Sequence, residues 1–469
     1  MDDILKLDAT EQAAQIARVD LSAETLMRAT LARIASLNGS LNAVVSLRDA
    51  DDLLAEARAA DAGPVKGPLH GLPIAIKDLA DAAGLPTSQG SPAFAGQVAV
   101  TDAPHVARLR AAGAIVIGKT NTPEFGLGSH TYNPVHGATC NPYDPSVSCG
   151  GSSGGAAVAL ATGMLSIADG SDMMGSLRNP AGWNNVYGMR PSWGRVPAEP
   201  GGDTFLHQLS TNGPMARSPA DLALLLNVMS GPDPRQPHGR NEAEIGALSG
   251  EVAGKRIAWL ADWGGAWPFE AGILDLCQQA LMVMEDLGCV VEPLAAPFDR
   301  DALWESWALL RSWQVGAGLA PLLDDPATRD RLKPEAIWEI ERGQALSAMQ
   351  VHAASVIRSD WFARAAELFD TYDALALPTA QVWPFAMDLT WPREVAGQAM
   401  DTYHRWMEVM IPASLTGLPA VAVPAGFGAQ GLPMGLQLIG RRGADADLLE
   451  LAQGYHAATG WPARRPPLS

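Results

Sequence analysis

Three short segments carry side chains suited to nucleophilic or proton-transfer chemistry, and the first contains a lysine. Lys77 directly follows the apolar run Leu72–Ile76, which is typical of a short buried strand. Burial disfavours the charged form of a lysine, so Lys77 at the end of such a strand is a candidate for a neutral base near pH 7. An ordinary lysine paired with Asp78 is the alternative.

The second segment is a glycine-rich loop with two adjacent hydroxyl groups. Ser152 and Ser153 lie within Cys149–Gly155, ahead of an alanine-rich stretch that favours a helix. Glycines let the backbone approach other groups closely, so these hydroxyls are candidates for catalysis. Capping of the following helix is the alternative. A phosphate-binding role is also conceivable, but no lysine follows in motif position.

The third segment, Asp169–Ala181, places Ser176 directly after Gly175 in a tight loop. Consecutive backbone amides in such a loop can bind the oxyanion that develops during acyl transfer. A solvated turn is the alternative for this segment.

A fourth motif is misleading. Gly113–Thr120 matches the phosphate-loop pattern G-x-x-x-x-G-K-[ST], but its variable positions are Ala-Ile-Val-Ile. Those residues favour a buried strand, whereas a phosphate loop must be flexible and must follow a strand. Pro123 also disfavours an immediate helix. We interpret this segment as a buried strand that ends in a turn.

Together, the segments resemble the amidase signature family over nearly the whole chain, from Leu41–Ala43 to Gly435–Gly440. The usual place of Gly118–Thr120 in that family accounts for the false phosphate-loop match. The motifs that carry the resemblance are Gly71–Asp78, Gly118–Asn121 with Glu124 and Phe125, Gly150–Gly155, Gly175–Arg178 with Pro180 and Ala181, and Thr416–Ala420.

The resemblance implies a catalytic triad of two serines and a lysine. Ser176 matches the nucleophile, Ser152 the bridging serine and Lys77 the base, and the peptide bond into Ser152 is expected to be cis. The implied reaction is hydrolysis of a carboxylic amide through a serine acyl-enzyme, with Lys77 and Ser152 relaying the proton from Ser176. The resemblance implies no metal and no organic cofactor.

The resemblance also places an oxyanion hole in the backbone amides of Met173, Met174, Gly175 and Ser176. The family usually has Thr-Asp-Thr-Gly-Gly-Ser-Ile-Arg in this loop, and here Met174 replaces a glycine. If that position needs a positive φ, methionine is costly there. The two methionines either line the acyl pocket or face the core.

Gly128, Ser129 and Trp183 are candidate substrate contacts. Trp183 flanks the nucleophile region, which suggests an apolar or aromatic acyl or amine group; packing of helices against the sheet is the alternative role for the tryptophans. His130 and His136 are candidates for substrate contact, and we interpret them as hydrogen-bonding residues of a loop. Arg178 is expected to form a structural ion pair with Asp172.

Three rival functions stay open. One is an inactive family member that serves as a binding or structural subunit. Another is the ammonia-supplying subunit of a transfer-RNA amidotransferase. The third is a thiol enzyme that uses Cys149, although no histidine is adjacent in sequence to pair with it; we interpret Cys149 as a packing residue.

These groups must be positioned by alternating strands and helices. The pattern predicts an α/β class. The resemblance implies a single α/β/α layered domain around a large, mixed, mostly parallel sheet, spanning 1–469. We expect 67–197 to be the catalytic core and about 300–360 to be a variable, helical region that shapes the substrate pocket. Helices are expected from Ser22 to Asn38-Gly39 and over Pro104–Ala112, Ala156–Met164 and Ile273–Leu287, and further strands over Ala114–Ile117, Lys255–Leu260, Cys289–Val291, Val421–Pro424 and Gly435–Ile439.

The amino-acid composition limits the kinds of partner that the protein is expected to bind. Among 469 residues, 33 are Lys or Arg and 51 are Asp or Glu, giving a formal charge of −18. That charge opposes binding to nucleic acid or to an anionic membrane, and a small-molecule amide is the expected partner. The four cysteines include no C-x-x-C pair, and the N-terminus lacks a signal-peptide pattern. We therefore expect a cytoplasmic protein; a homodimer, common among relatives, is left open.

Overall fold

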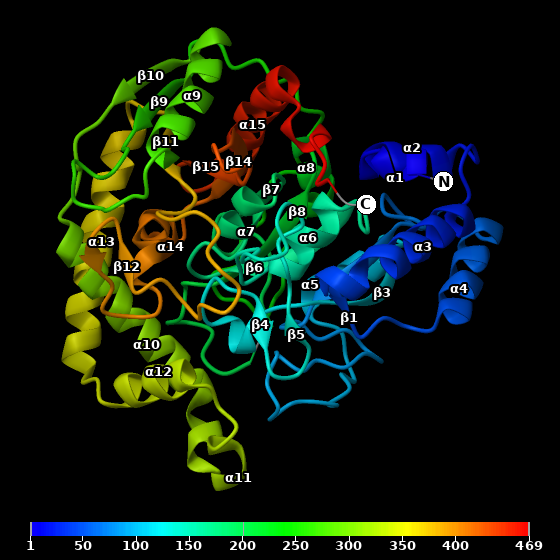
Figure 1. The fold of residues 1–469 in the computed structure, drawn as a ribbon, viewed down its shortest axis with the longest axis horizontal. Helices are drawn as coiled ribbons and strands as arrows, with labels where there is room; N and C mark the ends of the chain where they lie inside the picture. Colours follow the sequence, from blue (N-terminus) through cyan, green and yellow to red (C-terminus); the bar gives the residue numbers. More distant parts are fainter. Residues whose placement is uncertain (1, 200, 468–469) are drawn as a thin grey trace.

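The computed structural model describes residues 2–199 and 201–467, and its largest element is an eight-stranded sheet (Figure 1). The strands of this sheet are β6 (Ile167–Asp172), β7 (Tyr187–Arg190), β8 (Thr211–Ala216), β9 (Arg256–Trp259), β10 (Val290–Pro293), β11 (Ala374–Pro378), β14 (Ala420–Phe427) and β15 (Pro433–Ile439). Their order across the sheet is β10-β9-β11-β15-β14-β7-β8-β6. The α/β class and the large mixed sheet expected from the sequence are confirmed.

The directions of the strands correct one part of that expectation. Only the pairs β10–β9 and β9–β11 are parallel, while every other neighbouring pair in the sheet is antiparallel. The expected mostly parallel sheet is therefore wrong. For one of these pairs the local reason is clear: β14 and β15 follow one another through the short turn 428–432, and consecutive strands joined by a tight turn must be antiparallel.

Helices cover both faces of the large sheet. On one face α15 packs against α8 and α9, and on the other face α7 packs against β7, β14 and β15 while α6 packs against β6 and β8. This gives the layered arrangement that the resemblance implies. The bounds are α6 (Gly154–Ala161), α7 (Arg178–Trp183), α8 (Pro219–Met229), α9 (Ile273–Asp286) and α15 (Asp445–Thr459).

A separate three-stranded sheet holds the lysine of the candidate triad. Its order is β1 (Val44–Val45), β3 (Ile115–Thr120), β2 (Pro73–Lys77), and α3 (Ala23–Leu41), α4 (Ala50–Ala62) and α5 (Pro104–Ala111) belong to the same part of the chain. The false phosphate-loop motif is indeed the buried strand β3. The backbone N–H of Lys77 donates to Asp169 Oδ1 on β6 at 2.8 Å, so the two sheets meet beside this residue.

The first long helix shows how local chemistry sets its ends. The Ser22 side chain accepts a hydrogen bond from the amide of Thr25, which confirms Ser22 as the N-cap. The expected end at Asn38-Gly39 is wrong, since α3 continues to Leu41 and Asn42 adopts the left-handed conformation. Asn38 Oδ1 instead accepts the amides of Ala43 and Val44, so this side chain fixes the chain that leaves the helix.

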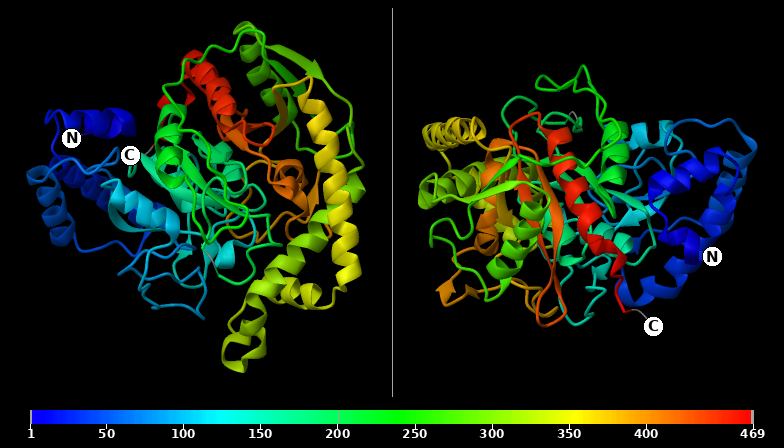
Figure 2. Two further views of the ribbon diagram at one scale, coloured as in Figure 1. Left: turned by 180° about the vertical axis from the view of Figure 1, so that it is seen from behind. Right: turned by 90° about the horizontal axis from the view of Figure 1, so that it is seen from above.

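The segment around 300–360 is helical, as expected. Two long helices, α10 and α13, pack side by side at the end of the molecule opposite α3 and α4 (Figures 1 and 2). None of the helices in the described ranges is long and apolar enough to cross a membrane. The helices of this segment are α10 (Arg300–Asp324), α11 (Pro326–Arg329), α12 (Pro334–Gln344) and α13 (Ala348–Phe369).

Short elements complete the chain. They are α1 (Asp2–Lys6), α2 (Ala9–Ala17), β4 (Tyr132–Asn133), β5 (Gly137–Ala138), β12 (Glu394–Val395), β13 (Gln398–Ala399), α14 (Ile411–Thr416), and the 3-10 helices η1 (Glu124–Gly126), η2 (Arg405–Met410) and η3 (Trp461–Ala463).

Candidate active site

Lys77 ends β2 and is buried among hydroxyl groups. Its Nζ lies 2.8 Å from Ser152 Oγ, 2.9 Å from Ser153 Oγ and 3.0 Å from Ser171 Oγ, and its side chain is nearly inaccessible. Burial lowers the pKa of Lys77 from 10.5 to about 7, although the charges of Asp169 and Asp172 act in the opposite direction. A substantial share of the molecules thus carries a neutral amine near pH 7, with a lone pair that can accept a hydroxyl proton.

The glycine-rich loop brings the serine pair to this amine. The peptide bond between Gly151 and Ser152 is cis, as the resemblance implied. Gly150 has a positive φ of 79°, and a Cβ there would lie 2.5 Å from Asn179 Oδ1, so this position accepts only glycine. Ser153 stands at the N-cap of α6, but its side chain makes no capping hydrogen bond and contacts Lys77 instead. For Ser153, the helix-capping alternative is therefore wrong.

Ser176 lies in the loop between β6 and α7. Its carbonyl accepts the amide of Ser153 at 3.1 Å, which joins the loop 173–177 of the predicted nucleophile (the nucleophile loop) to the serine pair. Within the described chain the Ser176 hydroxyl has no hydrogen-bond partner, and 7% of the residue remains exposed. The structure therefore brings Lys77 and Ser152 into direct contact and brings Ser176 to them through the backbone. Catalytic hydrogen bonds are often long before substrate binds.

Asp172 shapes the nucleophile loop from inside. Its carboxylate accepts the amides of Gly175 and Leu177 at 2.9 and 3.1 Å, and it forms ion pairs with the buried Arg178 and Arg190. Burial by itself would raise the pKa of Asp172, but the two guanidinium groups hold it well below its usual range. The ion pair expected between Arg178 and Asp172 is confirmed.

The backbone amides of the loop divide into two groups. Gly175 has its N–H bound to Asp172. The amides of Met173, Met174 and Ser176 make no hydrogen bond within the described chain, so these three are available to a ligand oxygen. Three unpartnered donors in four residues form an arrangement suited to an oxyanion.

The replacement of a glycine by Met174 fits the backbone. Met174 is not among the described residues with a positive φ; it is Gly175 that has this conformation, at 81°. A Cβ on Gly175 would lie 2.5 Å from Met410 Cγ. The Met174 side chain is 3% exposed and packs in the main core. The loop therefore tolerates methionine at 174 and requires glycine at 175.

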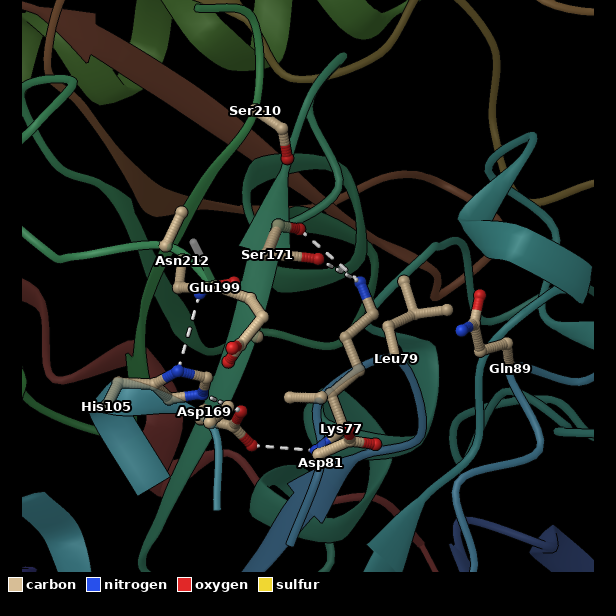
Figure 3. A pocket seen from close by; sticks show the side chains of 14 residues that line it. Lys77, Leu79, Asp81, Gln89, His105, Asp169, Ser171, Glu199, Ser210 and Asn212 are labelled. Atoms are coloured by element: carbon tan, nitrogen blue, oxygen red, sulfur yellow. Dashed lines mark hydrogen bonds and ion pairs between the residues drawn. The ribbon is translucent and has the colours of Figure 1, made fainter. Parts of the chain in front are cut away.

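A cavity of about 440 Å³ reaches Lys77 from the side of Ser171 (Figure 3). Beneath it His105 Nε2 lies 3.1 Å from Asp169 Oδ2, and Asn212 Nδ2 lies 3.4 Å from His105 Nδ1. Ser171 and Asp169 both contact Lys77, and the sequence patterns assigned them no role. The sequence pointed to these two residues only through their position in the segment that precedes Ser176.

The three predicted substrate contacts lie in different surroundings. Gly128 has a positive φ of 91°, and a Cβ there would lie 3.8 Å from the ring of Tyr403. The Ser129 hydroxyl is buried without a partner. Trp183 has no exposed surface and stacks on Trp406 with ring centroids 5.9 Å apart. Trp183 has no free surface in this structure, so its contact with a substrate stays a prediction.

The remaining candidates act within the fold. His130 bonds to Ser148 Oγ at 2.8 Å, and burial lowers the pKa of His130 to about 4. His136 Nε2 lies 3.3 Å from Ser88 Oγ, so both histidines make hydrogen bonds from their loop to other segments of the chain. Cys149 is fully buried, and burial raises the pKa of its thiol well above the usual range, which leaves no reactive thiolate.

Comparison with known proteins places the chain in a family. The family model described as Amidase matches residues 25–449. The chain belongs to the amidase signature family. It is 34% identical to an acylamidase of Rhodococcus erythropolis, covering 98% of this chain and 97% of that protein. It is 35% identical to a glutamyl-tRNA(Gln) amidotransferase subunit of Chloroflexus aurantiacus, over all of both chains.

Among solved structures, a bacterial aryl acylamidase of the amidase signature family superposes with a TM-score of 0.91 at 28% identity, covering 98% of this chain and 99% of that one. Such relatives act on amide C–N bonds, and this member of the amidase signature family is accordingly an amide hydrolase. The alternative of an inactive scaffold is not favoured by these relatives.

Proposed function

We propose that this amidase signature enzyme hydrolyses a small-molecule carboxylic amide through an acyl-enzyme on Ser176. The observation that carries the proposal is the contact of 2.8 Å between the buried Lys77 Nζ and Ser152 Oγ. The hydrogen bond from the Ser153 amide to the Ser176 carbonyl and the unpartnered loop amides support it. We keep residues 67–197 as the catalytic core within a single domain.

In the proposed first half-reaction, the lone pair of neutral Lys77 accepts the proton of Ser152 Oγ, and Ser152 takes the proton of Ser176. Ser176 Oγ then forms a bond to the amide carbon, and the carbonyl oxygen becomes an oxyanion. The amides of Met173, Met174 and Ser176 hold this oxyanion. Gly175 has a different role, because its amide is bound to Asp172 and its positive φ turns the loop.

Collapse of the tetrahedral intermediate breaks the C–N bond. Ser152 delivers its proton to the leaving nitrogen and recovers a proton from Lys77, so the amine departs neutral and Lys77 is again unprotonated. A water molecule then attacks the acyl-enzyme by the same relay and releases the carboxylic acid. Gly128 and Ser129 are proposed to contact the substrate, because the Ser129 hydroxyl is buried without a protein partner.

The test is amine or ammonia release from a panel of aliphatic and aromatic amides. We expect Ser176→Ala, Ser152→Ala and Lys77→Ala to abolish turnover. Ser153→Ala is a matched control, since Ser153 also contacts Lys77 Nζ, at 2.9 Å, but has no part in the relay. The proposal fails if Ser152→Ala and Ser153→Ala lose activity equally, or if an alkyl fluorophosphonate does not label Ser176.

A further inference from the structure

Arg311 on α10 is a buried cation that reaches the nucleophile loop. The residue is 3% exposed, and its Nε donates to Glu339 Oε1 at 2.7 Å. One terminal nitrogen donates to Tyr403 Oη at 2.6 Å. The other terminal nitrogen has a single acceptor within the described chain, the sulfur of Met173 at 3.2 Å.

This last contact leaves the guanidinium poorly satisfied. A guanidinium carries five N–H donors, and a thioether is a weak acceptor. Buried charged donors are normally bound to oxygen, because leaving such a group unpaired costs more than leaving a neutral group unpaired. Arg311 therefore keeps hydrogen-bonding capacity in the direction of Met173, which lies in the proposed oxyanion loop.

Apolar side chains lie on one side of this nitrogen, and the cation of Lys333 lies near the guanidinium, with its Nζ donating to the Leu127 carbonyl at 2.6 Å. Leu127, Val315 and the ring of Tyr403 form a buried cluster, and Met173 and Trp391 pack against it. An apolar wall with one or two fixed polar groups is the usual composition of a small-molecule site.

The charge of Arg311 is already balanced. Glu339 accepts hydrogen bonds from Arg311, from Tyr403 at 2.8 Å and from Ser312 at 2.6 Å. Burial raises the pKa of Tyr403 well above its usual value, so its hydroxyl remains protonated and donates to Glu339. Lys333 adds a second cation near this pair, and the charges of Glu335, Glu124 and Glu339 oppose it. A carboxylate brought here would face these carboxylates, whereas an uncharged oxygen would not.

We propose that Arg311 determines specificity, binding an uncharged carbonyl-type oxygen that the amide substrate carries in addition to its reacting amide. The substrate oxygen takes the place of the Met173 sulfur at the terminal nitrogen of Arg311, and the apolar wall binds the rest of the group. This inference rests on the proposed function of the same site.

The test uses matched substrate pairs that differ by one oxygen. In the first pair, phenylbutanamide is compared with its keto analogue, in which one chain methylene is a carbonyl; a second pair carries the same change on the amine side. We expect the wild-type enzyme to prefer one keto amide by at least about tenfold in kcat/KM, the range of a hydrogen bond to a charged donor. No preference in either pair would overturn the inference.

Variants assign the preference to Arg311. The double variant Arg311→Met with Glu339→Gln removes both charges together, and the keto to methylene ratio is expected to fall to about one. Met173→Leu removes the competing sulfur and is expected to keep the ratio or raise it. Arg300→Met changes another arginine of α10 and is expected to leave the ratio unchanged. A ratio that survives in the double variant overturns the inference.

A binding measurement separates this inference from the proposed function. Kd values of both members of each pair are measured by calorimetry on Ser176→Ala, which does not depend on turnover. If the wild-type enzyme cleaves no amide but Ser176→Ala still binds a keto amide at least about tenfold more tightly, the proposed reaction fails and the binding role of Arg311 stands. If the wild-type enzyme cleaves every amide and the Kd values are equal, the reaction stands and the binding role of Arg311 fails.

Discussion

The state of Lys77 predicts how activity depends on pH. The amine must be neutral to accept the proton of Ser152, and burial lowers its pKa to about 7. Activity should therefore rise with pH through a single ionisation near neutrality, and not through one near the ordinary lysine value of 10.5.

The size of the effect follows from the position of the midpoint. With a pKa of about 7, roughly a tenth of the enzyme is active near about pH 6 and roughly nine tenths near about pH 8, so kcat/KM should increase about tenfold between them. kcat/KM rises with pH because Lys77 acts as a base, and protonation at low pH removes the lone pair of its amine.

The assay is kcat/KM for a neutral amide such as benzamide, measured between about pH 5 and pH 9 by ammonia release. This parameter reports the ionisation of the free enzyme. His130 does not account for a midpoint near neutrality, because its pKa is lowered to about 4.

Asp169→Asn gives a matched control for the cause of the midpoint. The charge of Asp169 raises the pKa of Lys77, and asparagine can still accept the Lys77 amide, so the midpoint should move to lower pH in this variant. A flat profile in the wild-type enzyme, a midpoint above about pH 9, or an Asp169→Asn midpoint that moves upward would refute the reasoning.

Three further predictions concern the loop and the core around it. Gly175→Ala places a Cβ 2.5 Å from Met410 Cγ at a positive φ, so we expect kcat to fall about 100-fold with KM little changed; steady-state kinetics with normal values would contradict this. Asp172→Asn leaves two buried arginines without a carboxylate and should reduce the free energy of unfolding by about 3–5 kcal/mol, measured by urea denaturation; an unchanged midpoint would show that the ion pairs do not stabilise the fold. Cys149→Ala should remain active, and the native thiol should resist aromatic disulfide reagents, because Cys149 is fully buried; since the more accessible Cys140 is also a free thiol, rapid inactivation of the native enzyme but not of Cys149→Ala would show that the site depends on Cys149.

The sequence predicted those parts of the site that short motifs encode. Lys77 and Ser152 were identified from segments 75 residues apart, and they lie in hydrogen-bond contact. The glycines make these segments recognisable in the sequence. Only glycine fits at positions such as Gly150 and Gly175, where a Cβ would overlap neighbouring atoms.

Contacts between distant segments were not predictable from the same reasoning. The alternation of strands and helices located β14 and β15 but not their directions, because periodicity reports burial and not strand polarity. Arg311 has no local motif, and its contact with Met173 depends on how α10 packs against α12, α13 and α14. The binding of the Gly175 amide by Asp172 was missed because it depends on side-chain geometry within the loop.

The two sheets divide the proposed catalytic residues between them. Lys77 ends a strand of the small sheet, whereas Ser176 follows a strand of the large one, and the hydrogen bond from the Lys77 amide to Asp169 crosses the junction. If the two sheets slid past one another by about 1 Å, the Lys77 amine would move away from the Ser176 hydroxyl while both sheets stayed folded. A displacement of that size can reduce the rate about 100-fold. Turnover in this enzyme should therefore depend strongly on how the small sheet packs against the large one. In mild denaturant, turnover should decline before the circular dichroism signal of the helices does.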